Sequence, residues 1–165
     1  MENSRYTQTC VKQKAISSPE KYCKISVIEP PQSGMDMWAS YELLEEGFKT
    51  LFISKTSLTN LCEESTCLVA RNDDEEVIGF IAASGSINKQ YIWYLTTDVC
   101  CRNKGIGTAL LQKLIDTGDT LQLNVRELNT TAINLYKSLG FNVVAKHPGY
   151  YPNGDTAYVM EYSEG

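Results

Sequence analysis

The chain has 165 residues, of which 42% are hydrophobic and 21% charged, and its formal net charge at pH 7 is −5. This length suits one hydrophobic core, no apolar stretch approaches a membrane span, and the acidic balance disfavours binding to nucleic acid. We expect a loosely ordered polar leader over residues 1–22 and a single domain over 23–165. The start, "MENSRYTQTC", lacks signal-peptide features, so we expect a cytoplasmic protein without a membrane anchor.

The sequence contains six cysteines and one histidine, His147. The cysteines are Cys10, Cys23, Cys62, Cys67, Cys100 and Cys101. Because the domain is large enough to fold without cross-links and no secretory signal is evident, we expect these cysteines to be reduced and mostly buried. No CxxC pair occurs, and we therefore expect no metal site.

The first half of the chain predicts one strand, two helices and a hairpin. Residues 23–30 are rich in β-branched side chains and stop at a proline pair, as a strand would. Apolar residues recur at helical spacing over 36–61, where Gly47 is expected to divide two helices. An acidic turn separates 66–71 from 77–85, which indicates a hairpin.

The second half alternates strands and helices. It predicts strand 90–99, helix 104–116, strand 121–127, helix 130–139 and a closing hairpin of strands 141–147 and 156–162. Alternation places Tyr91, Trp93, Leu95 and Thr97 on one face of their strand. Helices on a mixed sheet make an α/β domain.

A glycine-bearing stretch, "RNKGIG" (102–107), lies where strand 90–99 runs into the following helix. Backbone N–H groups at a helix N-terminus bind anions, and glycines allow the ligand to approach. The stretch lacks the G-x-x-x-x-G-K-[ST] phosphate loop, and Leu110 stands at the third glycine position of the dinucleotide fingerprint. The pattern that fits is [QR]-x-x-G-x-[GA]. On this hexamer alone, a helix start with incidental glycines remains an alternative.

A more specific motif, N-x-x-A-I-x-x-Y-x-x-x-G-F, runs from Asn129 to Phe141. With "RNKGIG" and the strand before it, this motif makes residues 91–162 resemble the GNAT superfamily of acetyl-CoA-dependent N-acetyltransferases. The end, "GYYPNGDTAYVM" (149–160), resembles the RimI-type protein N-terminal acetyltransferases more narrowly. The implied fold is a mixed, mostly antiparallel sheet of six to seven strands, flanked by helices, with splayed central strands. Before residue 91 only the element order agrees.

The resemblance implies that acetyl-CoA is the cofactor. Its pyrophosphate would bind the turn residues Arg102, Asn103, Lys104, Gly105, Ile106, Gly107 and Thr108. Strand 90–99 would separate from strand 121–127 and bind pantetheine through the backbone near Leu95, Thr97 and Val99. Asn129 would cap the next helix and contact CoA.

The resemblance also implies catalytic roles. Tyr136 matches the family tyrosine that hydrogen-bonds the CoA sulfur and protonates the leaving thiolate, although a place in the helix's apolar stripe is the alternative. The amine would attack directly, without an acyl-enzyme.

The general base departs from the family pattern. Asn124 stands where RimI-type enzymes carry a glutamate, and an amide cannot take up the proton. Tyr91 aligns with a tyrosine that serves as base in one group of N-terminal acetyltransferases. Glu42, Glu45 or His147 acting through water are further alternatives.

The acceptor is expected at the closing hairpin. Tyr150 and Tyr151 would line a peptide entrance, with Tyr41 and Glu42 on the opposite wall; a plain hairpin turn is the alternative for the tyrosine pair. We predict transfer to a protein or peptide α-amine by a monomer or homodimer. The second hypothesis is that the acceptor is a small amine (a polyamine, amino sugar or antibiotic). The third hypothesis is that the protein is a non-catalytic acyl-CoA-binding module.

Overall fold

The computed structural model describes residues 19–48 and 53–164, so most of the predicted leader lies outside the described residues. The elements in chain order are α2 (Pro19–Tyr22), β1 (Val27–Glu29), α3 (Gly34–Gly47), α4 (Lys55–Glu64), β2 (Thr66–Arg71), β3 (Val77–Ser86), β4 (Lys89–Thr97), η1 (Val99–Cys101), α5 (Ile106–Ile115), β5 (Thr120–Arg126), α6 (Thr130–Ser138), β6 (Asn142–His147) and β7 (Ala157–Tyr162). The order is the predicted one. The first strand, β1, is shorter than the predicted range 23–30, and the short elements α2 and η1 were not predicted.

The described strands form one seven-stranded sheet in the hydrogen-bonding order β1-β2-β3-β4-β5-β7-β6. The pairs β1–β2, β5–β7 and β6–β7 are antiparallel, and β4–β5 is parallel. The register of β4 with β5 ends at Tyr91 and Gln122, although both strands continue. The prediction of an α/β fold with a mixed, mostly antiparallel sheet is confirmed.

By their contacts the residues divide into two compact units. The first unit comprises residues 1–82 and 94–110, and the second comprises 83–93 and 111–165. β3, β4 and α5 each contribute to both.

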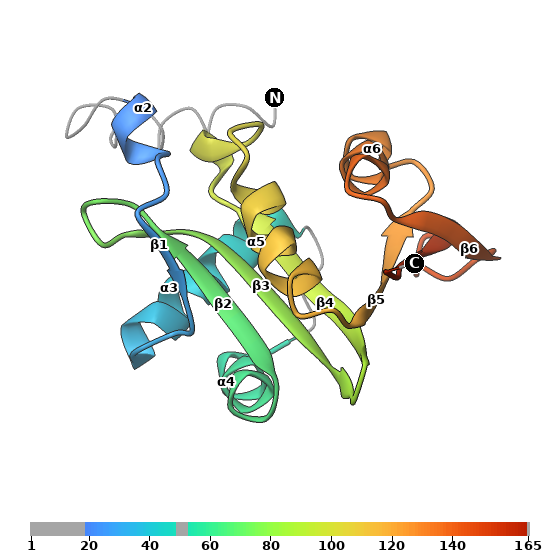
Figure 1. The fold of residues 1–165 in the computed structure, drawn as a ribbon, viewed down its shortest axis with the longest axis horizontal. Helices are drawn as coiled ribbons and strands as arrows, with labels where there is room; N and C mark the ends of the chain where they lie inside the picture. The colour runs from blue at the N-terminus through green and yellow to red at the C-terminus, as the bar shows by residue number, and fades with distance from the viewer. Residues whose placement is uncertain (1–18, 49–52, 165) are drawn as a thin grey trace. The chain divides into compact units, whose positions relative to one another are not determined.

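In the first unit, β1, β2 and β3 lie side by side (Figure 1). Alternate side chains of β2 and β3 pack with Leu44 of α3 and Leu58 of α4 into one buried cluster. Opposite that face, a Cβ at Gly79 would lie 2.6 Å from Ile106 of α5. Glycine at this position therefore lets the start of α5 approach β3 closely.

A buried ion pair fastens α3 to β2 in the first unit. The Asp36 carboxylate accepts two hydrogen bonds from the Arg71 guanidinium, which also donates to Glu29 at 2.8 Å. Hydrogen bonding to Arg71 holds the pKa of Asp36 below its usual range. Removing one partner of such a pair would leave a buried charge without compensation.

In the second unit, α6 lies beside the sheet that contains β5 and β6 (Figure 1). The Asn129 side chain accepts a hydrogen bond from the Ala132 N–H at 3.2 Å, and Gly140 has φ of 100° just after the helix. Both helix boundaries are therefore as predicted. Phe141 packs between Tyr136 and Tyr162, with ring centroids 5.7 and 5.6 Å away.

The expectation of reduced cysteines is wrong. Cys23 is bonded to Cys101 and Cys62 to Cys67, each pair with Cα atoms 5.2 Å apart, and Cys100 is also disulfide-bonded. Cys23 and Cys101 are 78 residues apart in sequence, so only the fold brings them within bonding distance. Among the described residues, no helix is both long and apolar enough to cross a membrane.

Candidate active site

The loop before α5 is anchored by Asp98 in the first unit. The Asp98 carboxylate accepts hydrogen bonds from the Cys100 N–H at 2.9 Å and from the buried Tyr22 hydroxyl at 2.8 Å. Its backbone N–H donates to the Ile78 carbonyl at 2.8 Å. Tyr22, at the end of the predicted leader, is thus part of the core that fixes where the loop begins.

Residues 102–105 form an exposed loop that ends where α5 starts at the buried Ile106. Asn103 and Gly105 have φ of 61° and 84°, so the chain turns sharply twice. A Cβ at Gly105 would meet nothing within 4 Å, and glycine is therefore required by the backbone conformation rather than by crowding. The first N–H groups of a helix have no intrahelical acceptor and carry partial positive charge. The loop therefore has the chemistry of an anion site.

Leu95, Thr97 and Val99 are half-buried in the first unit and lie beyond Tyr91, where the register of β4 with β5 ends. Between them Thr96 is buried and donates from Oγ1 to the Leu43 carbonyl at 3.2 Å. This bond connects the end of β4 to α3. Because side chains alternate along a strand, Leu95 and Thr97 point to the face of β4 opposite Thr96.

The second unit gathers the predicted tyrosines. Burial, with a contribution from Tyr151, raises the pKa of Tyr136 to about 12. Burial, with contributions from Tyr150 and Tyr151, raises the pKa of Tyr91 to about 12. Burial also raises the pKa of Tyr151, although the nearby Arg126 opposes this. These three phenols form the tyrosine cluster (Tyr91, Tyr136 and Tyr151), and all are protonated at neutral pH.

Asn124 borders this cluster through its backbone. Its N–H hydrogen-bonds the Tyr91 hydroxyl, which lowers the pKa of that phenol against the larger effect of burial. The last registered pair of β4 with β5, Tyr91 with Gln122, lies two residues before Asn124 in β5. The structure thus links Tyr91 to Tyr151 and to the Asn124 backbone, and Tyr151 to Tyr136. Their catalytic roles stay predictions.

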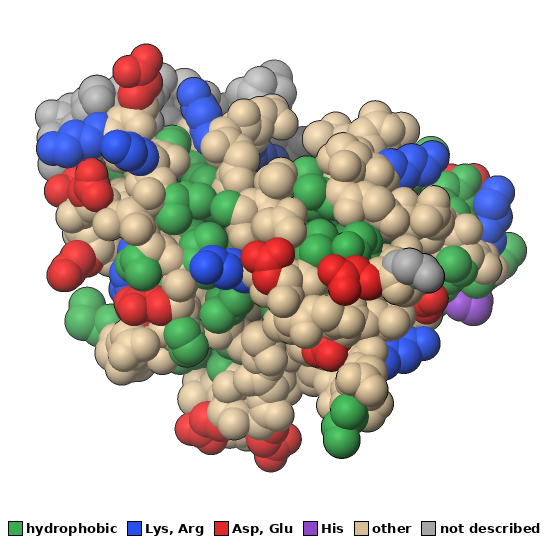
Figure 2. Space-filling model, viewed as in Figure 1, with side chains coloured by type: hydrophobic (Ala, Val, Ile, Leu, Met, Phe, Trp, Pro, Cys, Tyr) green, Lys and Arg blue, Asp and Glu red, His purple; other side chains and the backbone are tan. Residues whose placement is uncertain are grey.

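Tyr150 is 53% exposed, and its ring contacts those of Tyr151 and His147 with centroids 5.1 and 6.2 Å away. His147 is exposed and is the one histidine in Figure 2, where acidic and basic side chains are interspersed over the face shown. His147 therefore lies beside Tyr150, the more exposed residue of the Tyr150–Tyr151 pair.

Tyr41 and Glu42 lie on α3 in the first unit, where each already has a partner. The Trp38 indole donates to Glu42 at 2.6 Å, and the Lys55 ammonium lies 5.5 Å from the Tyr41 ring centroid. Burial and a hydrogen bond to Glu45 raise the pKa of Tyr41.

Two residues near these sites were missed by sequence reasoning. Burial, with Asp98 and Glu42, raises the pKa of Glu46, against an opposing effect of Arg102. Arg126 contacts the turn that carries Tyr151. Local spacing does not indicate these contacts, because Asp98 and Arg102 are distant from Glu46 in sequence, and Tyr151 and Asp155 are distant from Arg126.

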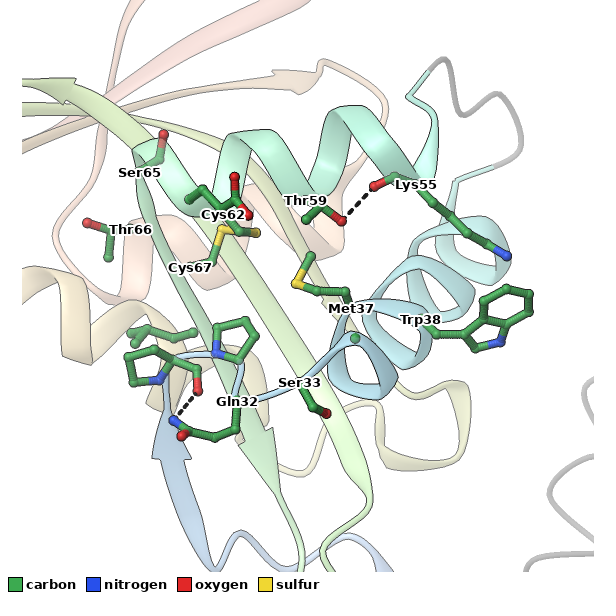
Figure 3. Close-up of a pocket in the computed structure, with 15 residues that line it drawn as sticks. Gln32, Ser33, Met37, Trp38, Lys55, Thr59, Cys62, Ser65, Thr66 and Cys67 are labelled. Carbon is green, nitrogen blue, oxygen red and sulfur yellow. Dashed lines mark hydrogen bonds between the residues drawn. A yellow bond between two sulfur atoms is a disulfide. The ribbon is translucent and has the colours of Figure 1, made fainter.

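A cavity of about 630 Å³ lies in the first unit between the β1–α3 connection, α4 and the start of β2. Figure 3 shows Met37, Trp38 and the Cys62–Cys67 disulfide along its wall. None of the predicted site residues lines it. Among the described residues, no group of three or more His, Cys, Asp or Glu side chains could hold a metal.

Comparisons with known proteins agree on one family. The model of the acetyltransferase (GNAT) family matches residues 35–141. An uncharacterized N-acetyltransferase of Methanocaldococcus jannaschii is 31% identical over 78% of this chain and 86% of its own length. The ribosomal protein bS18-alanine N-acetyltransferase of Salmonella typhimurium is 30% identical over 73% of this chain and 84% of its own. The crystal structure of the corresponding Escherichia coli enzyme has 27% identity and a TM-score of 0.72, covering 84% of this chain and 95% of that one.

Proposed function

Since the chain belongs to the acetyltransferase (GNAT) family and is an N-acetyltransferase that uses acetyl-CoA, we propose that its acceptor is the α-amine of a protein or peptide. The family match covers both the loop after β4 and α6. The similarity to bS18-alanine N-acetyltransferases, which act on a protein, supports this class of acceptor.

The tyrosine cluster is the observation that carries the proposal. Phenols with a pKa near 12 remain protonated at pH 7, so their protons are present for a strongly basic leaving group but the phenols cannot act as bases. An α-amine, with pKa about 7.7–8.0, is about 10–17% neutral at pH 7, whereas a lysine amine is about 0.04% neutral. The deprotonation cost is thus lower for an α-amine by more than about 2 kcal/mol. A site whose tyrosines cannot act as bases therefore favours an α-amine over a lysine amine, because a larger fraction of the α-amine is already deprotonated.

The anion-binding loop of the first unit suits the donor. Backbone N–H groups from Arg102 to Thr108 would hold a pyrophosphate, and the exposed Arg102 and Lys104 would add positive charge. The backbone at Leu95, Thr97 and Val99 would bind pantetheine. When bound, acetyl-CoA supplies the activated acyl group that the amine attacks.

Tyr136 would donate its phenolic proton to the departing thiolate, a role that its raised pKa permits. Asn129, already the helix cap, would also contact CoA. Tyr91 and Asn124 would hydrogen-bond the amine or the water that carries its proton away, and Glu42, Glu45, Glu46 and His147 are candidates that receive this proton through water.

The acceptor would meet Tyr150 and Tyr151, whose hydroxyls would bond the peptide backbone, while Tyr41 and Glu42 would contact it from α3. A monomer or homodimer and a cytoplasmic location also remain predictions. Disulfides are unusual in reducing compartments, so thiol titration of protein taken directly from cells is the test of location.

A panel of amines tests the proposal. Purified protein with acetyl-CoA is offered peptides with a free N-terminus, polyamines and aminoglycosides, and the free CoA released is measured. We expect release with peptides and little with the others. Faster release with a polyamine or an aminoglycoside would contradict the proposal, as would no release with any amine. Tyr136→Phe is the control for background hydrolysis.

A further inference from the structure

Arg126 connects the end of β5 to the turn that precedes β7. It is the last residue of β5 and pairs with Ala157, the first residue of β7. From there its guanidinium reaches back over the turn, where Nη1 donates to Asp155 Oδ2 at 3.0 Å and to Asn153 Oδ1 at 3.1 Å. One side chain therefore spans the turn from its base.

The turn itself is closed by further hydrogen bonds. The Tyr151 N–H donates to the Asp155 carbonyl at 3.2 Å, and the Gly154 N–H donates to the Tyr151 carbonyl at 2.8 Å. Asn153 Nδ2 donates to Asp155 Oδ2 at 2.9 Å, the same oxygen that Arg126 contacts. These bonds hold the backbone of Tyr151 in the turn, but none of them involves its ring.

The Arg126 guanidinium also fixes the ring. Its Cζ lies 3.8 Å from the Tyr151 ring centroid, within the range of a cation–π contact. Tyr151 in turn raises the pKa of both Tyr91 and Tyr136, so its ring lies near both phenols. Arg126 thus contacts both the turn and Tyr151, a member of the tyrosine cluster.

We propose that Arg126 is a positioning residue that holds Tyr151 in place for the acceptor, and so sets the acceptor affinity without touching the reacting atoms. This inference rests on the proposed function of the turn as the acceptor site. The flat face of a guanidinium can stack on the tyrosine ring while the N–H groups at the edge of the guanidinium donate hydrogen bonds. A lysine ammonium offers only a point charge. The geometry therefore requires arginine rather than positive charge alone.

Steady-state kinetics of three variants test the proposal. Arg126→Met keeps a flexible apolar stem, and Arg126→Lys keeps the charge but loses the planar fork. Lys146→Met is the matched control, because the Lys146 ammonium makes a comparable contact in the same unit, 5.0 Å from the ring centroid of Tyr158. We expect Arg126→Met to raise the acceptor KM by about tenfold. The kcat and the Kd for acetyl-CoA should not change, Arg126→Lys should recover little, and Lys146→Met should match the unmodified enzyme.

A second measurement does not depend on activity. The charge of Arg126 lowers the pKa of Tyr151. Ultraviolet titration of each protein against its Tyr151→Phe counterpart should therefore show Tyr151 ionising at higher pH in Arg126→Met. This readout also shows that the variant is folded with the turn in place.

The outcomes are distinguishable. An active enzyme whose acceptor KM is unchanged by Arg126→Met, or fully restored by Arg126→Lys, would overturn the role of Arg126 while the proposed function stands. A rise in KM that persists when Tyr151→Leu is already present would also overturn it, because Arg126 would then act through something other than Tyr151. An unmodified enzyme that releases no CoA with any peptide would overturn the proposed function, and this inference with it.

Discussion

The two units build their candidate sites from different parts of the chain. In the first, the loop 102–105 and the start of α5 offer backbone N–H groups from consecutive residues. In the second, the tyrosine cluster joins side chains from β4, α6 and the turn before β7. A backbone site is specified locally, by two turns and a helix start. A side-chain site depends on packing between distant segments.

The same contrast extends to what holds each unit together. Both disulfides with described partners, and the Asp36–Arg71 ion pair, belong to the first unit. The second unit contains no cysteine, and its described contacts include aromatic packing, sheet hydrogen bonds and the Arg126 interactions. We therefore expect covalent and backbone changes to affect the first unit, and side-chain truncations to affect the second.

The largest expected effect is on stability of the first unit. Cys23–Cys101 joins residues 78 apart and Cys62–Cys67 residues 5 apart. The chain-entropy model assigns them about 4.5 and about 2 kcal/mol. Cys23→Ala should thus lower the free energy of unfolding in urea about twice as much as Cys62→Ala. Hydrogen exchange should accelerate first in residues 94–101. Equal losses, or acceleration that begins in β5 and β7, would contradict the contrast.

The next effect concerns the tyrosine cluster. Tyr136→Phe removes the proposed proton donor and keeps the ring, so kcat should fall at least about 100-fold while the Kd for acetyl-CoA is unchanged. Tyr158→Phe is the matched control: its hydroxyl donates to Glu127 at 2.9 Å in the same unit. This control should lose only about 1 kcal/mol of stability and keep its kcat. Similar kcat values for the two variants would remove Tyr136 from the mechanism.

A smaller effect is expected at the loop. Gly105 and Gly118 have φ of 84° and 82°, and a Cβ on either would meet nothing within 4 Å. Alanine should strain both backbones by about 1–2 kcal/mol. Only Gly105→Ala should weaken acetyl-CoA binding in calorimetry, by about tenfold. If Gly118→Ala weakens binding as much, the loop is not the anion site.

The smallest expected effect concerns pH: kcat should not change over a range in which an ordinary tyrosine begins to lose its proton. Because burial raises the pKa of Tyr136 to about 12, its proton is present throughout the neutral range and is lost only as the pH rises towards that value. With saturating acceptor, kcat should stay level between about pH 8 and pH 10, close to where an unperturbed tyrosine would titrate. A fall in kcat with a midpoint near pH 9 would assign the donor to another group.

The sequence predicts most of the fold because its signals are local. The alternation in β5 places Leu121, Leu123 and Val125 in the core, and the caps at Asn129 and Gly140 bound α6. The loop motif is equally local. The disulfides were not predicted, since their geometry arises only when α2, η1, α4 and β2 pack together.

The same limit applies to the side-chain site. The family resemblance indicates Tyr91, Asn124 and Tyr136 individually. No spacing in the sequence indicates that Tyr151 lies near both Tyr91 and Tyr136. Arg126 precedes Tyr151 by 25 residues, and its stacking depends on how the turn folds back over β5. Such contacts are properties of the tertiary structure alone.

Acetyl transfer to a matched pair of peptides tests the central claim most directly. One peptide carries a free N-terminus and an internal lysine, and its twin has the N-terminus blocked. With acetyl-CoA and the purified enzyme, mass spectrometry should find one acetyl group on the N-terminal residue of the first peptide and none on its twin. Acetylation of the lysine in the blocked peptide at a comparable rate would contradict the account.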